Sequence, residues 1–259
     1  MKALLILQRG RNRLNRVFRE IKLFIGSFFY KLFLLDHPVQ EKLRMSALDT
    51  AIAFVVNNQV EGDYLEFGVY KGKSFIRAYN KFKDHIERHR EYRLPRFIAF
   101  DSFEGLPESK EKDVPQQYYK GAFAFSQDNF LASIIAKGVN LSHLVVVPGF
   151  YNKSLSDETK RKHNIKQSSV VYIDCDIYES AVPVFRFITN LIQTGTVIVI
   201  DDWFRHRGQP NQGIQRACNE WLAENPHIKL VQLHAWERIA FIVLCNDVAD
   251  KNLGEEIIP

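Results

Sequence analysis

Five short runs of β-branched and aromatic residues alternate with helix-length segments between residues 63 and 200, and this alternation constrains the fold more than any other feature. The runs are Asp63–Phe67, Arg96–Phe100, His143–Pro148, Ser169–Ile173 and Thr196–Ile200. Short apolar runs of this kind are typical of strands buried on both faces of a sheet. Because they alternate with helical segments, the sequence predicts a doubly wound α/β fold with a parallel sheet.

The segments between these runs carry apolar residues at helical spacing, and two more strands follow them. The expected helices lie near Gln40–Gln59, Ser74–His89, Gln127–Lys137, Lys153–His163, Tyr178–Ile192 and Gly213–Asn225. The final strands, Lys229–Leu233 and Ile239–Leu244, are separated by too few residues for a crossover helix. They must therefore form an antiparallel hairpin at the C-terminal end of a mostly parallel sheet.

The positive charge of the chain is concentrated in its N-terminal arm. The chain has 35 Lys and Arg residues and 30 Asp and Glu residues. Residues 1–31 hold eight of the basic residues and one of the acidic residues, which leaves 27 basic and 29 acidic residues in the remainder. Since nucleic-acid binding needs a basic face on the folded body, this distribution argues against a nucleic-acid partner. We divide the chain into a helical arm, residues 1–60, and an α/β body, residues 61–259.

The arm is strongly amphipathic over residues 9–35. On a helical wheel an apolar stripe lies opposite Arg13, Arg16 and Arg19. The most apolar part, Leu23–Leu35, is shorter than the ~20 residues that span a bilayer. No small-residue cleavage site follows it, so a signal peptide is not expected. Two interpretations stay open: the helix lies on anionic lipid, or it packs against a second subunit or over the active site.

The cysteines predict a reduced environment. Cys175, Cys218 and Cys245 lack the spacing of a zinc site or of a disulfide framework. We therefore expect a cytoplasmic protein, which the lipid interpretation of the arm would place peripherally at the inner membrane surface.

Aspartates follow two consecutive strands of the predicted sheet. Asp174 and Asp176 follow one strand, and Asp201 and Asp202 follow the next. If these strands are neighbours, Asp174, Asp201 and Asp202 lie within a few ångströms of each other at the edge where open α/β sheets bind ligands. Crowded carboxylates repel unless a proton or a hard cation compensates them, so the pattern favours a divalent ion such as Mg²⁺. The alternative is that each aspartate caps the helix or turn after its strand.

The first two strands end in acidic residues beside a glycine-containing turn. Gly68 and Gly72 permit a tight turn and close approach of a ligand to the backbone, but their spacing is that of neither a dinucleotide nor a phosphate loop. Asp101 ends the second strand, where an acidic residue commonly accepts hydrogen bonds from ribose hydroxyls. Glu66 would suit a cationic amine. The pair fits S-adenosylmethionine, which has both groups; the alternative is two unrelated surface carboxylates.

Four segments in order resemble one family. They are YLEFGVYKGKSF, IAFDSFEGLPE, VVYIDCDIYES and GTVIVIDDWF, within approximately residues 60–245. They resemble the macrocin O-methyltransferase-like (TylF/MycF-type) family of Mg²⁺- and S-adenosylmethionine-dependent sugar O-methyltransferases. The resemblance implies a class I methyltransferase (Rossmann-like) fold for the body and a sugar or glycoside acceptor. It also associates the N-terminal helices with oligomer contacts and substrate closure, so we expect a homo-oligomer.

The resemblance also implies site residues. Cofactor contacts are expected at Glu66, Gly68, Val69, Tyr70, Gly72, Ser74, Asp101, Ser102, Phe103, Ser126 and Gly149. The metal ligands are expected to be Asp174, Asp201 and Asp202, with Asp176 as the general base. A role of Asp176 as a fourth ligand or as a residue behind the ligands stays open. The loop Trp203–Gln212 is expected to line the acceptor pocket.

Two other functional classes compete with this hypothesis. A non-catalytic nucleotide-binding protein docked on a membrane surface is disfavoured because all four aspartates are present. An NAD-dependent oxidoreductase is disfavoured because the dinucleotide fingerprint is missing. The sequence does not identify the acceptor or the hydroxyl that is methylated.

Overall fold

The computed structural model describes residues 43, 45–89, 91–110 and 116–245. The chain divides into two compact units, Met1–Arg44 and Met45–Pro259. The amphipathic segment 9–35 falls outside the described residues, so both interpretations of it stay predictions. Within the described ranges, no helix combines the length and apolar character that crossing a bilayer requires.

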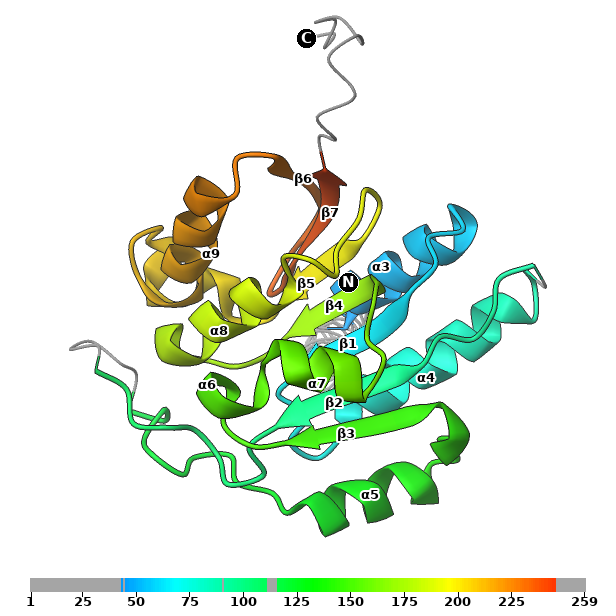
Figure 1. The fold of residues 1–259 in the computed structure, drawn as a ribbon, viewed down its shortest axis with the longest axis horizontal. Coiled ribbons are helices and arrows are strands. Elements are labelled where there is room, and N and C mark those ends of the chain that lie inside the picture. Colours follow the sequence, from blue (N-terminus) through cyan, green and yellow to red (C-terminus); the bar gives the residue numbers. More distant parts are fainter. Residues whose placement is uncertain (1–42, 44, 90, 111–115, 246–259) are drawn as a thin grey trace, which may run out of the picture. The chain divides into compact units, whose positions relative to one another are not determined.

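The described body is built on a seven-stranded sheet with the order β3-β2-β1-β4-β5-β7-β6 (Figure 1). The strands are β1 (Asp63–Phe67), β2 (Phe97–Asp101), β3 (Leu144–Pro148), β4 (Ser168–Ile173), β5 (Val197–Ile200), β6 (Ile228–Ala235) and β7 (Ile239–Cys245). Strands β1 to β5 pair in parallel, whereas β7 is antiparallel to both β5 and β6. The predicted doubly wound sheet and its C-terminal hairpin are confirmed.

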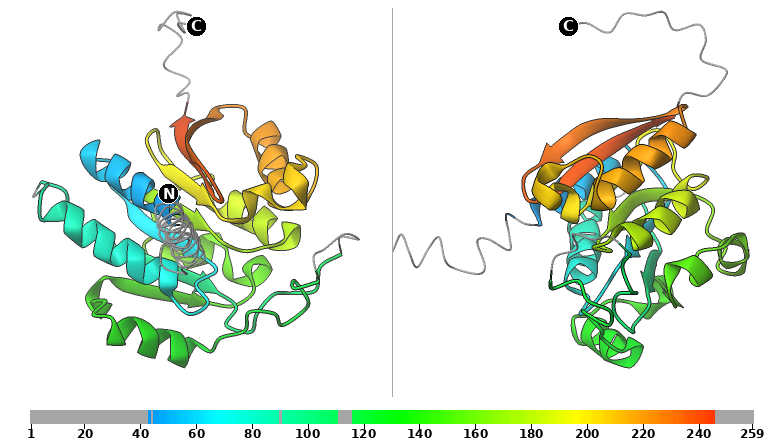
Figure 2. Two further views of the ribbon diagram at one scale, coloured as in Figure 1. Left: turned by 180° about the vertical axis from the view of Figure 1, so that it is seen from behind. Right: turned by 90° about the vertical axis from the view of Figure 1, so that its left-hand side faces the viewer.

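Helices cover both faces of this sheet (Figure 1, Figure 2). One face packs against α3 (Ser46–Asn57), α4 (Lys73–Ile86) and α5 (Gln127–Ala136). The other face packs against α8 (Tyr178–Ile188) and α9 (Gly213–Glu224). The shorter helices are α6 (Tyr151–Ser154), α7 (Asp157–Lys162), η1 (Leu141–His143), η2 (Asp202–Phe204) and η3 (His206–Gly208). Central strands with two buried faces explain why their sequences are continuously apolar.

Helix α3 belongs to the core of the body. Its buried side chains include Leu48, Ile52 and Val55, which join the cluster formed with α4 and the sheet. The compact unit accordingly begins at Met45, whereas the sequence places this helix in an arm ending at residue 60. The difference arises because helical spacing shows that a stripe is apolar but does not show which surface covers it.

One predicted helix is wrong. The single helix expected over Lys153–His163 is two short helices, α6 and α7. Leu155 and Ser156 between them have extended backbone conformations, and the Ser156 hydroxyl accepts a hydrogen bond from Thr159 N at 3.2 Å. Serine thus caps a new helix instead of continuing the previous one.

Candidate active site

The ends of β1, β4 and β5 lie side by side. Asp174 N donates to Phe67 O at 2.8 Å, and Asp201 N donates to Ile173 O at 2.9 Å. These bonds extend the parallel ladder beyond the last paired residues. The predicted adjacency of the two aspartate-bearing strands is therefore confirmed. Because β1 has β2 on one side and β4 on the other, the crevice above them is the topological switch point where doubly wound sheets bind ligands.

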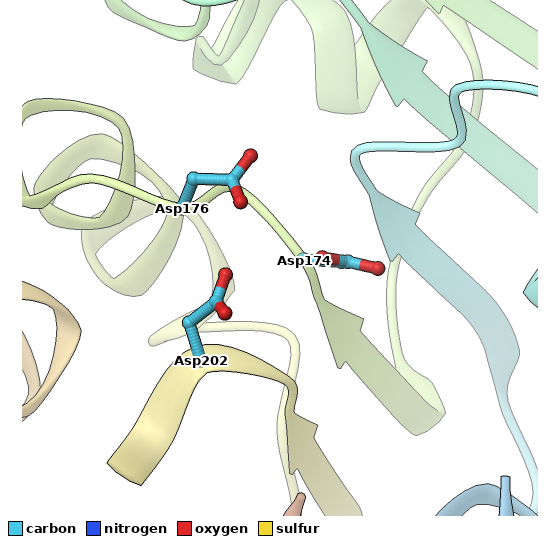
Figure 3. A group of neighbouring side chains, drawn as sticks. All are labelled: Asp174, Asp176 and Asp202. Atoms are coloured by element: carbon cyan, nitrogen blue, oxygen red, sulfur yellow. The ribbon is translucent and has the colours of Figure 1, made fainter. Parts of the chain in front are cut away.

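Three aspartates converge at this edge (Figure 3). Asp174 follows β4, Asp176 lies two residues further on, and Asp202 opens the turn after β5. Their ligand oxygens all lie within 4.8 Å of one another. The backbone of Asp176 has φ 62, a left-handed conformation that Asp tolerates better than most residues. This conformation places the Asp176 carboxylate beside those of Asp174 and Asp202.

The cluster is short of positive charge. Burial raises the pKa of Asp174 well above its ordinary value, and the carboxylates of Asp201, Asp176 and Asp202 raise it further. Burial and the neighbouring Asp202 raise the pKa of Asp176 to about 8. The Asp202 Oδ2 atom is buried and has no hydrogen-bond partner among the described residues. Hard oxygen donors at this spacing, one of them unpartnered, fit a divalent cation of the Mg²⁺ type.

Asp201 lies outside this trio and forms an ion pair with Arg238. The Arg238 Nε atom donates to Asp201 Oδ1, and both side chains are buried. Arg238 is the last residue of the turn between β6 and β7. Its guanidinium also lies 5.5 Å from the Tyr172 ring centroid and donates to Met45 Sδ at 3.2 Å. Asp176 thus joins Asp174 and Asp202 in the cluster, whereas Asp201, whose charge raises the pKa of Asp174, is paired with Arg238; its role as a metal ligand stays a prediction. No motif or spacing in the sequence indicated Arg238.

Two further side chains contact Asp202. Arg205 Nε donates to Asp202 Oδ1 at 2.8 Å, and the Tyr118 hydroxyl donates to the same oxygen at 3.2 Å. Arg205 belongs to the segment expected to line the acceptor pocket. Tyr118 comes from the long loop between β2 and α5, and no motif in the sequence indicated it. Both contacts leave Asp202 Oδ2 available.

The turn after β1 needs glycine at its first position. A Cβ atom on Gly68, where φ is +90, would lie 1.8 Å from the carbonyl oxygen of Asp174. Gly72 adopts φ 79 and forms the N-cap of α4. Val69 and Tyr70 lie between these two glycines, and their N–H groups donate to Asp101 Oδ2 at 2.9 and 3.1 Å. The predicted cofactor turn and the acid at the end of β2 therefore form one unit.

Asp101 also organises the segment that follows it. Its Oδ1 atom accepts a hydrogen bond from Phe103 N at 2.8 Å. The Ser102 hydroxyl donates to Gly105 O at 2.7 Å, and the Phe103 backbone is left-handed with φ 59. Three of about four acceptor positions on the Asp101 carboxylate are thus used by backbone N–H groups, which leaves capacity for one more donor.

Glu66 is enclosed by the protein. Its side chain is fully buried, and its two oxygens accept hydrogen bonds from the hydroxyls of Tyr64 and Ser74. Burial raises the pKa of Glu66 to about 7 despite these two hydrogen bonds. Both Glu66 oxygens are thus occupied by protein hydroxyls, and its expected contact with a ligand amine stays a prediction. The hydrogen bond from Ser74 links the end of β1 to the first turn of α4.

The two remaining predicted cofactor positions lie at element ends. The Ser126 hydroxyl caps α5 by accepting from Asn129 N at 3.3 Å. Gly149 follows β3 with φ +122, and its N–H donates to Asp101 O at 2.9 Å. Gly149 therefore lies beside Asp101 at the carboxyl edge of the parallel strands, whereas Ser126 caps a helix.

Solved methyltransferase structures share this fold. The calicheamicin methyltransferase CalS11 matches with a TM-score of 0.63 and 21% identity, over 84% of this chain and 84% of its own. The O-methyltransferase NovP matches with a TM-score of 0.58 and 20% identity, over 77% of this chain and 78% of its own. With the mixed seven-stranded sheet, these likenesses define the class I methyltransferase fold.

Sequence similarity identifies one family within this fold. The model of the macrocin O-methyltransferase (TylF) family matches residues 35–227, which is most of the chain, so the chain belongs to this family. The expected resemblance is confirmed. A Streptomyces olivaceus relative, 8-demethyl-8-(2,3-dimethoxy-alpha-L-rhamnosyl)-tetracenomycin-C 4'-O-methyltransferase, is 24% identical over 173 residues. That alignment covers 64% of this chain and 62% of the relative's length.

Proposed function

We propose that this protein is an S-adenosylmethionine- and Mg²⁺-dependent O-methyltransferase that acts on a hydroxyl of a sugar or glycoside. The observation that carries the proposal is the carboxylate cluster of Asp174, Asp176 and Asp202 beside the Gly68–Gly72 turn. In such an arrangement a methyl donor held by the turn and an acceptor hydroxyl held by the cluster meet at the switch point of the sheet.

The relatives support a sugar acceptor. The Streptomyces olivaceus relative is named for O-methylation of a rhamnosyl-bearing tetracenomycin. One CalS11 structure, with a TM-score of 0.52 and 19% identity, is named as a TDP-rhamnose 3'-O-methyltransferase. Family membership together with these two names favours a pyranose hydroxyl over other acceptors.

The cofactor site would use the turn after β1 and the acid after β2. The Asp101 carboxylate retains room for a ribose hydroxyl, and the backbone of residues 68–72 can approach the donor closely. When bound, S-adenosylmethionine supplies a methyl group on a positively charged sulfur, so its transfer to oxygen releases a neutral thioether. The protein's contribution is alignment of the attacking oxygen with the carbon–sulfur bond that breaks.

The carboxylate cluster would supply the remaining chemistry. Asp174 and Asp202 would hold the divalent ion, which when bound would lower the pKa of an acceptor hydroxyl and fix its position. Asp176 would accept the proton that this hydroxyl loses as its oxygen forms the new bond to the methyl carbon. Arg238 holds Asp201 behind these residues, where it limits the repulsion among four carboxylates.

A methyl-transfer screen tests the proposal. The full chain is incubated with S-adenosylmethionine, Mg²⁺ and a panel of methyl glycosides of L-rhamnose, D-glucose and D-galactose, and products are detected by mass spectrometry. We expect methylated glycoside and S-adenosylhomocysteine in equal amounts, and loss of both with EDTA. Formation of neither product on any glycoside contradicts the proposed activity, and transfer that resists EDTA contradicts the role of the ion.

A further inference from the structure

The loop between β2 and α5 closes on itself next to the carboxylate cluster. Leu106 N donates to Ala122 O at 2.9 Å. The same two residues pack with Tyr118 and with Ile177, which directly follows a residue of the cluster. These contacts hold the second half of the loop, residues 116–125, in a defined place beside the cluster.

Aromatic rings from this segment form a row that leads to the cofactor turn. The Tyr118 hydroxyl contacts Asp202, and its ring centroid lies 6.2 Å from that of Phe123. The Phe123 centroid lies 6.0 Å from that of Tyr70, which in turn lies 5.7 Å from that of Phe125. The row therefore connects the carboxylates to the turn that would hold the methyl donor.

The middle of this row combines exposure with backbone strain. Tyr70 is 39% exposed and Phe123 is 44% exposed. Both residues have left-handed backbones, with φ 42 and φ 61, although bulky residues rarely adopt this conformation. Such strain persists where the surrounding structure fixes it, and it gathers at ligand sites. Tyr70 and Phe123 therefore present exposed aromatic rings on strained backbone, a combination that favours a ligand-contacting surface.

We infer that residues 116–125 form the acceptor side of the active site and that the ring of Phe123 is the surface on which the acceptor sugar lies. This inference rests on the proposed function. It names Phe123 as a residue that determines acceptor specificity, with Tyr70 supporting its ring edge-to-face.

The two faces of a pyranose match the aromatic row on one side and the carboxylate cluster on the other. One face of a pyranose ring presents C–H groups, which pack on an aromatic ring, and its edge carries hydroxyls. With the C–H face on Phe123, the hydroxyl edge is directed toward the cluster of Asp176 and Asp202, which Tyr118 joins to the aromatic row. Apolar walls with a few convergent polar groups are typical of small-molecule sites.

Phe123→Ala and Phe123→Leu test this inference, with Tyr119→Ala as the matched control. Tyr119 lies in the same segment, is 67% exposed, and has no ring contact among the described residues. The acceptor is the methyl glycoside from the rhamnose, glucose and galactose panel that the wild-type protein methylates fastest. KM and kcat are measured for that glycoside, and S-adenosylmethionine affinity is measured by calorimetry.

We expect Phe123→Ala to raise the glycoside KM by about tenfold, which corresponds to the loss of about 55 Å² of apolar burial, and Phe123→Leu to raise it by about threefold, because leucine keeps part of the apolar surface but not the flat ring. Tyr119→Ala should keep the wild-type KM, and donor affinity should be unchanged in all three variants. The leucine variant preserves an apolar side chain if the alanine variant fails to fold. Unchanged KM in the Phe123 variants, an equal rise in Tyr119→Ala, or weakened donor binding would overturn the inference. A wild-type protein inactive on every glycoside overturns the proposed function, and this inference with it.

Discussion

Replacement of Arg238 by Met should destabilise the fold by about 3–5 kcal/mol, because it leaves a buried negative charge without its partner. Arg238 and Asp201 form an ion pair in which the two side chains are 3% and 8% exposed. Asp201 lies next to Asp174, whose pKa its charge already raises. Methionine fills much of the arginine volume, so the loss reports charge more than packing.

This magnitude converts to a melting-temperature shift of about 10 °C for a body of this size. The double variant Arg238→Met, Asp201→Asn removes the uncompensated charge, and it should recover most of the lost free energy. Arg216→Met is the control, since the Arg216–Glu220 pair has side chains that are 43% and 45% exposed. An exposed pair of this kind should contribute less than about 1 kcal/mol.

Urea denaturation followed by circular dichroism at pH 7.5 measures all three variants against the wild-type protein. The reasoning is refuted if Arg238→Met loses no more free energy of unfolding than Arg216→Met. It is also refuted if the double variant is as unstable as the single one, because the loss would then come from packing rather than from unpaired charge.

Glu66→Gln should remove a pH dependence of stability. The folded carboxyl has a pKa of about 7 against an ordinary 4.5, so the free energy of unfolding of the wild-type protein should fall by about 3 kcal/mol relative to the variant as the pH rises from 4.5 to 8. Urea denaturation of both proteins across this pH range measures the difference, and an equal pH dependence in the two would contradict the prediction. Asp176→Asn should lower turnover by about 10²–10⁴-fold while Mn²⁺ affinity changes by less than about threefold; a loss of Mn²⁺ affinity of about tenfold or more would instead make Asp176 a ligand. The lipid interpretation of residues 9–35 predicts that the full chain floats with phosphatidylglycerol vesicles and that a variant with Arg13, Arg16 and Arg19 changed to Glu does not; equal recovery of both in solution favours the protein-contact interpretation.

The strands and the ends of the strands could be predicted because they depend on local pattern. Continuous apolar runs such as that of β5 arise from burial on both faces of the sheet. The residues that follow parallel strands lie at the carboxyl edge of the sheet, independently of how the helices pack. This strand pattern was sufficient to predict that Asp174 and Asp202 lie close together. The same logic located Asp101 beside the turn that begins at Gly68.

The contacts that complete the site could not be predicted because they join distant parts of the chain. Arg238 reaches Asp201 across 37 residues, and Tyr118 reaches Asp202 across 84. No spacing rule covers such distances, since they depend on how the C-terminal hairpin and the long loop pack. Glu66 shows the same limit: its polarity suggested a ligand contact, whereas the buried strand that carries it directs it to Tyr64 and Ser74.

Titration with Mn²⁺, followed by the decrease of the free-ion electron paramagnetic resonance signal, tests most directly whether the carboxylates converge on a cation. We predict one saturable site per wild-type chain, displaced by Mg²⁺ and weakened by about tenfold or more in Asp174→Asn and in Asp202→Asn. A wild-type chain without a saturable site, or variants that bind Mn²⁺ as tightly as the wild type, would contradict the account.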